Sequence, residues 1–533
     1  MTFAMAGRAA LAASLVFLFA FTALAGSKDP NATADHSKFE ALKQPFASGP
    51  EVTKACLTCH TEAAHQVMDT IHWTWDYKHT DPASGEEQHL GKKNVLNSFC
   101  GNIASNEPRC TSCHAGYGWD SPNFDFAKQE NVDCLVCHDT TGTYSKYPTK
   151  AGHPLYEPLT TPEGKTVNPP DLNKIAQNVG DSGRENCGAC HFSGGGADGV
   201  KHGDLDSSLI KGDKHLDVHM GMDGENMGCA ACHRASAHKW PGSRYDSLAA
   251  DAKGTGKPGE QRAVASCQSC HGDTPHPVSI DGLKLNDHTD RIACQTCHIP
   301  EFARGGVATK TLWDWSTAGK TKDGKAFTEL DEHGHPKYMS IKGSFEHGEN
   351  VTPEYAFTNG KVIYSQVGQK IDPSKPVSIN AFAGSHDDPE SRIWPFKLMR
   401  GKQAYDPVQN ILVFNHVYGP GDDSAFWTGL DWNKSIAAGM KAAGMDWSGK
   451  YDFVETEMWW PIAHMVAPAE EALACDDCHA KDGRLAKLAG FYMPGRDSTG
   501  WLDFLGLLAL AVAAVGVVGH GLLRIVFVKR TSP

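Results

Sequence analysis

The sequence predicts a mainly α-helical chain with a large irregular content, in which secondary structure is subordinate to a repeated cysteine motif. Eight copies of Cys-x-x-Cys-His use sixteen of the seventeen cysteines. This is the attachment signature of a c-type haem, with two thiols for thioether bonds and one histidine for the iron. Cys-x-x-Cys is also zinc spacing, but a histidine directly after each second cysteine favours haem. We therefore expect a multihaem cytochrome c fold organised by eight covalently attached haems. The motif residues are Cys56, Cys59, His60; Cys110, Cys113, His114; Cys134, Cys137, His138; Cys187, Cys190, His191; Cys229, Cys232, His233; Cys267, Cys270, His271; Cys294, Cys297, His298; and Cys475, Cys478, His479.

The N-terminal residues 1–25 have the pattern of a secretory signal peptide. Arg8 precedes an apolar stretch, and Ala23-Leu24-Ala25 is a small-x-small cleavage site. An uncleaved N-terminal anchor is the alternative. Export agrees with the motifs, because bacteria attach c-type haems on the periplasmic side. We therefore expect a periplasmic haem domain.

The rest of the chain divides into regions that differ in how many haem motifs they contain. Seven motifs lie in 26–300, too close together for a conventional apolar core, with helices expected at 35–42 and 62–72 and an irregular loop at 160–171. Residues 301–474 have no motif, and their tryptophans, Gly/Pro turns and alternating segments predict a mixed α and β-hairpin covering region. Helices are expected there at 435–443 and near 470–474. The eighth motif occupies 475–500.

The C-terminal segment is apolar. Phe504–Val528 is long enough to span a bilayer as one helix within a transmembrane segment at 501–528. Lys529 and Arg530 open a tail at 529–533 that the positive-inside rule places in the cytoplasm. A buried core helix is the alternative. We expect a haem domain anchored to the inner membrane. The net charge of −13 and the lack of basic runs argue against nucleic-acid binding.

Histidines outside the motifs are candidates for the second axial ligand. Electron-carrying haems of low potential need a second strong ligand, usually a histidine. Nineteen of the 27 histidines lie outside the motifs, and any one of them could instead be a surface or hydrogen-bonded residue. Seven such ligands would close seven haems and leave one for catalysis. The candidates are His72, His202, His219, His238, His276, His288 and His464, with His36 and His65 in reserve.

From about residue 35 to 497 the chain resembles the octahaem tetrathionate reductases. The resemblance is carried by the eight motifs in this order and by the phrases at 54–60, 71–75, 131–139 and 198–206. It implies a reactive second haem whose distal ligand is a lysine nitrogen, with a free cysteine and an aspartate nearby. It also implies a two-electron reduction of tetrathionate to thiosulfate, with nitrite and hydroxylamine as alternative substrates.

Carried onto this chain, the resemblance makes His114 the proximal ligand and Cys100 the free thiol. Asp198 and Lys201 match the aspartate–lysine pair, with Asp171 and Lys174 as the second choice. Burial beside iron depresses the pKa of a lysine, which frees its lone pair for the metal.

Cys100 admits two interpretations. As a thiolate near iron and a cationic lysine it would have a lowered pKa and could attack a sulfur–sulfur bond. As a free cysteine it could also be a small buried residue without a reactive role.

The expected function is that of a membrane-anchored reductase. The C-terminal span departs from the soluble members of the family and suggests a membrane partner that oxidises quinol, such as a b-type cytochrome. Two other classes remain open. One is an electron conduit with all eight haems closed, and the other is a hydroxylamine-oxidising enzyme with a tyrosine crosslink to its porphyrin.

Overall fold

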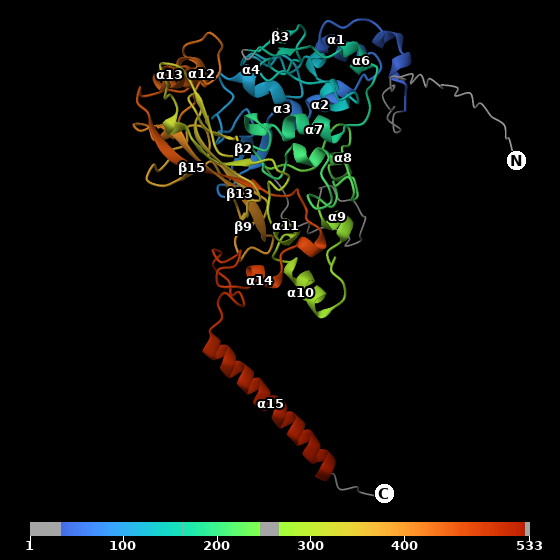
Figure 1. Cartoon of the computed structure of the whole chain (residues 1–533), viewed down its shortest axis with the longest axis vertical. Helices are drawn as coiled ribbons and strands as arrows, with labels where there is room; N and C mark the ends of the chain where they lie inside the picture. The colour runs from blue at the N-terminus through green and yellow to red at the C-terminus, as the bar shows by residue number, and fades with distance from the viewer. Residues whose placement is uncertain (1–32, 162–163, 246–265, 528–533) are drawn as a thin grey trace, which may run out of the picture.

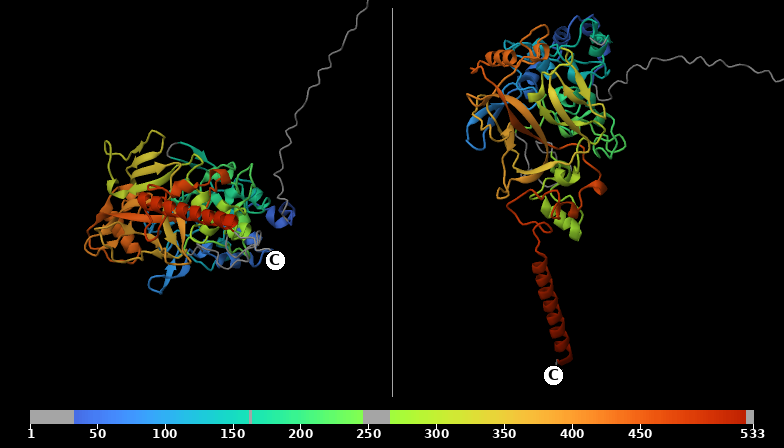
Figure 2. Two further views of the ribbon diagram at one scale, coloured as in Figure 1. Left: turned by 90° about the horizontal axis from the view of Figure 1, so that it is seen from below. Right: turned by 60° about the vertical axis from the view of Figure 1, so that its left-hand side comes forward.

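The computed structural model describes residues 33–161, 164–245 and 266–527 (Figure 1). The expected signal peptide and the basic tail lie outside these residues. Short helices of the motif region occupy one side of the body, a β-sheet lies beside them, and one long helix projects away from both (Figure 2).

The helices of the motif region are short, and half of them are single turns built around a motif. One helical turn brings residues i, i+3 and i+4 to the same face, so both thiols and the imidazole of a motif point to one side. These helices are α1 (Gly49–Cys56), α2 (Ala63–Met68), α3 (Ile71–Thr74), α4 (Glu107–Cys110), α5 (Leu135–His138), α6 (Leu172–Ala176), α7 (Arg184–His191), α8 (Cys229–Cys232), α9 (Gln268–His271), α10 (Ile280–His288), α11 (Cys294–His298) and α14 (Cys475–Cys478).

Several local expectations for this region differ from the structure. The helix expected at 35–42 is two 3₁₀ turns, and the one expected at 62–72 is broken between α2 and α3. The irregular loop expected at 160–171 contains a hairpin of β3 (Leu159–Thr160) and β4 (Thr166–Val167). A second small hairpin pairs β1 (Tyr77–Thr80) with β2 (Glu87–Leu90). Short segments such as these follow tertiary contacts more than their own propensity.

The covering region is dominated by one nine-stranded sheet, so the expected mainly α class describes the motif region only. Its strands run in the order β11, β15, β13, β5, β8, β7, β6, with β9 and β14 also paired to β13. The strands of the region are β5 (Thr309–Asp314), β6 (Thr328–Leu330), β7 (Pro336–Met339), β8 (Gly343–Gly348), β9 (Glu354–Thr358), β10 (Val362–Tyr364), β11 (Val377–Ser378), β12 (Asn380–Phe382), β13 (Arg392–Asp406), β14 (Ile411–Leu412) and β15 (Asp452–Pro461).

Two helices accompany the sheet, α12 (Phe426–Gly429) and α13 (Trp432–Ala442). Helix α13 matches the expected helix at 435–443, and it starts earlier because the Asp431 carboxylate accepts a hydrogen bond from the Lys434 N–H. The helix expected near 470–474 is a 3₁₀ turn over Ala469–Glu471.

The sheet packs directly against the segment that precedes the second motif. Phe99 belongs to the same buried cluster as Trp313, Met399 and Trp460 of the sheet. The Trp315 indole N–H donates to the Phe99 carbonyl over 2.6 Å. A region without haem motifs therefore holds the segment that carries Cys100.

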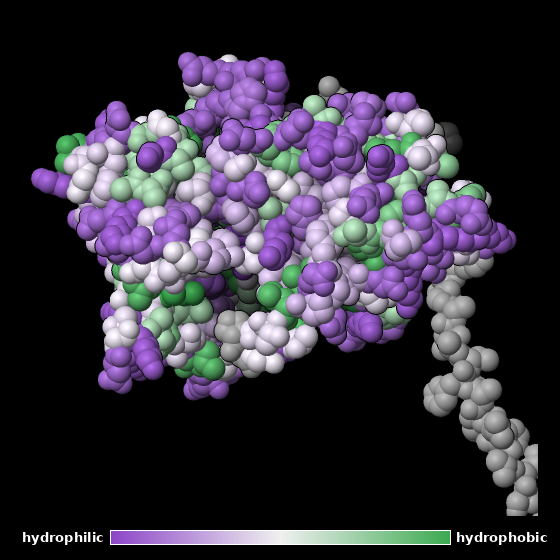
Figure 3. Space-filling view, turned by 90° about the horizontal axis from the view of Figure 1, so that it is seen from above, coloured by the Kyte–Doolittle hydropathy of each residue, from purple (hydrophilic) through white to green (hydrophobic). Residues whose placement is uncertain are grey.

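Helix α15 (Gly500–Phe527) is the long apolar helix expected at the C-terminus. It has a mean hydropathy of 2.3 and no buried residues. The end of the body opposite α15 is largely hydrophilic, with only small apolar areas (Figure 3). By length and composition α15 is a candidate to cross a membrane.

Candidate functional site

Seven of the eight motif histidines face a second histidine. The centroids of the paired rings lie 5.9–6.3 Å apart, although the partners come from distant parts of the chain. The pairs are His60–His36, His138–His238, His191–His72, His233–His464, His271–His219, His298–His276 and His479–His288.

This separation matches two imidazoles that share one metal ion. A metal–imidazole bond is about 2.0–2.1 Å long, so two rings on opposite sides of one ion have centroids about 6 Å apart. The N–H at Nδ1 of His138, His233 and His479 donates to a backbone carbonyl, at 2.8, 3.0 and 2.9 Å. Such a bond leaves Nε2 free for the metal. None of the seventeen cysteines forms a disulfide, so the motif thiols are available for thioether bonds. The residues therefore fit covalent c-type haems.

Six of the seven histidines expected as second axial ligands face a motif histidine in the structure. The seventh, His202, does not, and another histidine takes its place. The ring of His202 lies 5.1 Å from that of Trp460. His36, held in reserve by the sequence analysis, takes that place opposite His60. His65 is exposed on α2. The choice depends on long-range folding, because residue 36 precedes all the motifs.

His114 of the second motif has no facing histidine among the described residues. Its ring is fully buried in an aromatic cluster that includes Trp73, Trp119 and Phe124. Its Nε2 donates to the Trp73 carbonyl over 2.6 Å, and its Nδ1 has no partner. Burial lowers the pKa of His114 to about 3. A neutral imidazole with one donating and one free nitrogen has the hydrogen-bonding state of a metal ligand.

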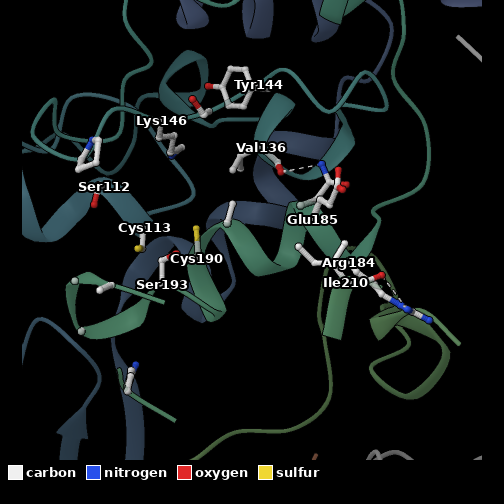
Figure 4. Close-up of a pocket in the computed structure, with 18 of the residues that line it drawn as sticks. Ser112, Cys113, Val136, Tyr144, Lys146, Arg184, Glu185, Cys190, Ser193 and Ile210 are labelled. Atoms are coloured by element: carbon white, nitrogen blue, oxygen red, sulfur yellow. Dashed lines mark hydrogen bonds between the residues drawn. The ribbon is translucent and has the colours of Figure 1, made fainter. Parts of the chain in front are cut away.

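A cavity of about 910 Å³ is lined by Cys110 and Cys113 of this motif, and we call it the second-motif cavity. Figure 4 shows the thiols of Cys113 and Cys190 facing the same space, with Arg184 and Glu185 at the other end. Cys100 and Lys201 also line the cavity. The structure thus brings the expected thiol and the expected lysine to the motif whose histidine has no partner histidine within residues 33–161, 164–245 and 266–527.

A glycine turn positions Lys201. Gly195 and Gly196 have φ of +80° and +102°, a conformation that disfavours other residues. A Cβ on Gly194 would lie 2.8 Å from Cδ of Lys201, so glycine there leaves room for the lysine stem. The side chain is open to the cavity and enclosed by protein elsewhere, and its Nζ lies 5.1 Å from the Trp460 ring centroid.

Burial holds the pKa of Lys201 well below its usual range, and the positive charges of Arg244 and Lys92 lower it further. A lowered pKa favours the neutral amine, whose lone pair is able to bind a metal.

The two aspartates lie away from the cavity lining. The Asp198 carboxylate accepts hydrogen bonds from the backbone N–H, over 3.0 Å, and from the hydroxyl of Ser207, so it stabilises the turn that precedes Lys201. Asp171 caps α6 by accepting from the Lys174 N–H, and the Lys174 side chain is exposed. Of the two candidate lysines, Lys201 alone lines the cavity.

Cys100 differs from expectation in its acidity. Its N–H donates to Oδ1 of Asn97 over 3.1 Å. Burial raises the pKa of its thiol, and the positive charges of Lys342 and Arg109 counteract only part of that rise. Of the two interpretations of Cys100, the one with a lowered pKa does not agree with this environment, because burial outweighs the nearby charges.

Sequence reasoning missed the basic and aromatic residues that complete the cavity wall, notably Lys92, Arg109, Arg244, Lys342, Trp427 and Trp460. Four of them come from segments more than 100 residues away from the second motif. No motif or periodicity marks them.

The repeated motif, the paired histidines and the free motif thiols define a multihaem c-type cytochrome. A family model described as bacterial cytochrome c matches residues 310–482. A search of curated proteins gave no match. The octaheme cytochrome c from Shewanella oneidensis is 43% identical, with a TM-score of 0.73, over 85% of this chain and 95% of that one. The chain therefore belongs to the octahaem cytochrome c family, and its eight motifs agree in number with the haems of that relative.

Proposed function

We propose that this cytochrome is a membrane-anchored periplasmic reductase that converts tetrathionate to two thiosulfates. The observation that carries the proposal is the content of the second-motif cavity. An enclosed lysine and a free cysteine line the space next to His114, the motif histidine that faces no second histidine in the part of the chain that the structure describes. His114 and the Lys201 amine would hold a catalytic haem, which a weaker ligand than imidazole would suit, whereas the paired imidazoles would suit electron transfer.

Cys100 is the proposed nucleophile. Its thiolate attacks the central sulfur–sulfur bond, forms a mixed disulfide with one half of the substrate and releases one thiosulfate. The thiol proton passes to a basic group of the cavity. Two electrons and that proton then cleave the mixed disulfide, which releases the second thiosulfate and restores the thiol. The haem, when bound, supplies these electrons from neighbouring haems of the chain.

Lys201 is the proposed distal ligand and proton carrier. Its amine would hold the haem iron more weakly than an imidazole would, which would leave the site accessible to substrate. Once displaced and protonated, it neutralises the negative charge of the substrate and can return a proton.

Helix α15 is the proposed membrane anchor. Its exposed apolar surface has no protein partner among the described residues, and a bilayer would cover it. An anchored cytochrome takes electrons from a partner in the same membrane, for which a quinol-oxidising b-type cytochrome is suited.

Two variants test the function. Lys201→Leu removes the amine, so one haem in eight should move toward high spin and tetrathionate turnover should fall by roughly 10²–10⁴-fold. Lys174→Leu is the matched control, because this lysine is exposed on α6 and should leave both readouts unchanged.

Cys100→Ala should leave the haem spectrum unchanged and impair tetrathionate reduction far more than nitrite reduction, because only the sulfur substrate uses thiol exchange. Equal losses on both substrates would assign Cys100 to pocket shape alone. An unaltered spectrum in Lys201→Leu would contradict the ligand assignment and favour an electron conduit.

A further inference from the structure

Four basic residues line the second-motif cavity around Cys100 and Lys201, namely Lys92, Arg109, Arg244 and Lys342. Among the described residues none of the four forms an ion pair with a carboxylate. Carboxylates also line the cavity, at Asp139, Asp181 and Glu185. Grouped positive charges that form no ion pair attract anions in a partly enclosed space.

The four residues fall into two groups. The positive charges that act most strongly on Cys100 are those of Lys342 and Arg109. The charge that acts most strongly on Lys201 is that of Arg244, and Lys92 acts on both Cys100 and Lys201. The cavity therefore has one positive group beside the thiol and another beside the amine.

Arg244 is held rigidly with donors to spare. Its guanidinium lies 4.7 Å from the ring centroids of Tyr245 and Trp460. Its Nη2 donates to the Tyr245 hydroxyl over 2.6 Å, and its Nη1 is buried without a hydrogen-bond partner. An arginine stacked between aromatic rings, with uncommitted N–H groups, is preorganised for an oxyanion.

Lys342, in the positive group beside the Cys100 thiol, also lies against an aromatic ring. Its Nζ lies 5.1 Å from the Trp427 ring centroid. Both residues thus present a basic head from an aromatic wall into the same cavity.

We propose that Arg244 and Lys342 bind the two charged ends of a dianionic substrate, so that the central bond of that substrate lies between Lys201 and Cys100. This inference rests on the proposed function and names how its substrate is recognised. It predicts selection for a small anion with two separated oxyanion ends over a singly charged or neutral one. The carboxylates of a haem are also oxyanions that Arg244 and Lys342 can bind. The experiment below distinguishes binding of the substrate from binding of the haem carboxylates.

The test measures the Kd of tetrathionate by calorimetry with the oxidised holoprotein in a Cys100→Ala background, where neither thiol exchange nor turnover occurs. Arg244→Gln and Lys342→Gln should each raise this Kd by about 10–100-fold, as expected for loss of a hydrogen bond to a charged group. Lys211→Gln is the matched control, since Lys211 lines the same cavity and is exposed. Its Kd should stay within about twofold, the range of a screened surface charge.

An unchanged Kd in Arg244→Gln and Lys342→Gln would overturn the inference. If the reduction potential of one haem also shifts and hydroxylamine turnover falls equally, the two side chains are assigned to haem carboxylates.

The outcomes separate the inference from the proposed function. Raised Kd values with full tetrathionate turnover in Cys100→Ala would keep the anion site and reject the thiol route. Unchanged Kd values with turnover abolished in Cys100→Ala would reject the anion site and keep the thiol route.

Discussion

Replacing Lys397 by methionine removes the contact by which the sheet holds the Lys201 segment. Lys397 lies on β13 and is fully buried. Its Nζ donates to the carbonyls of Val200 and Lys201 over 2.7 and 3.2 Å and to the Thr309 hydroxyl over 2.6 Å. Methionine keeps the length and the apolar stem but has no donor, so two carbonyls and the Thr309 hydroxyl lose the hydrogen bond that Lys397 donates.

The cost follows from these three contacts. A buried acceptor left without its donor destabilises the fold by roughly 1–3 kcal/mol. Removal of a dehydrated amino group offsets part of that loss, so we expect a net loss of about 2–4 kcal/mol in the free energy of unfolding. Residues that orient a ligand typically change activity by about 10–100-fold, and tetrathionate turnover should fall in that range.

Denaturant unfolding and the spin state of the second haem are the measurements, and Lys310→Met is the control. Lys310 is buried on neighbouring β5, where its Nζ lies 3.4 and 4.2 Å from the ring centroids of Phe345 and Trp313. It makes no contact with the Lys201 segment in the described structure, so its loss should leave the second haem unchanged. Equal spectral changes in both variants, or none in Lys397→Met, would refute the scaffold reasoning.

Lys310 also predicts a pH dependence. Burial lowers its pKa to about 7, below that of a lysine in an unfolded chain. Between pH 7 and about 10 the unfolded chain binds a proton that the folded protein lacks, so stability should rise with pH across this window. Denaturant titrations of Lys310→Met should show a smaller rise, and an identical slope in both proteins would reject the assignment.

Three further predictions concern ligands, stability and the anchor. Lys146→Met removes the cation that pairs with the buried Asp133 carboxylate, 3.1 Å away, and should cost about 3–5 kcal/mol in denaturant unfolding even though Tyr117 and Tyr144 still donate to that carboxylate. Loss of the exposed Lys487 ion pair should cost less than about 1 kcal/mol. His36→Ala should convert one haem to high spin in the absorption spectrum and His202→Ala none; the reverse result would reassign the ligand. Truncation after residue 499 should move active, haem-loaded protein from the membrane to the soluble fraction, and full-length protein already found in the soluble fraction would exclude the anchor.

The sequence by itself determined the local chemistry. A Cys-x-x-Cys-His motif needs only one helical turn to present two thiols and an imidazole on one face, so the attachment sites could be assigned without knowing the fold. Helix α15 was predictable for a similar reason, because its apolar length is a property of consecutive residues. Lys201 was identified through a resemblance, since nothing in its own neighbours marks a lysine as a ligand.

Only the tertiary structure decided which groups meet. His36 faces His60 and His202 lies beside Trp460 because of where distant segments return, and no periodicity encodes that return. Strand pairing likewise joins β13 to both β5 and β15, which lie far apart in the chain.

The pKa of Cys100 and the unpaired N–H groups of Arg244 were also decided only by the tertiary structure. The pKa of a buried group depends on how much water its surroundings exclude and on which charges lie near it. For Cys100 those surroundings come largely from the sheet, through contacts such as the bond from Trp315 to the Phe99 carbonyl. Burial and charge are sums over neighbours in space, so they exist only once segments hundreds of residues apart have packed together.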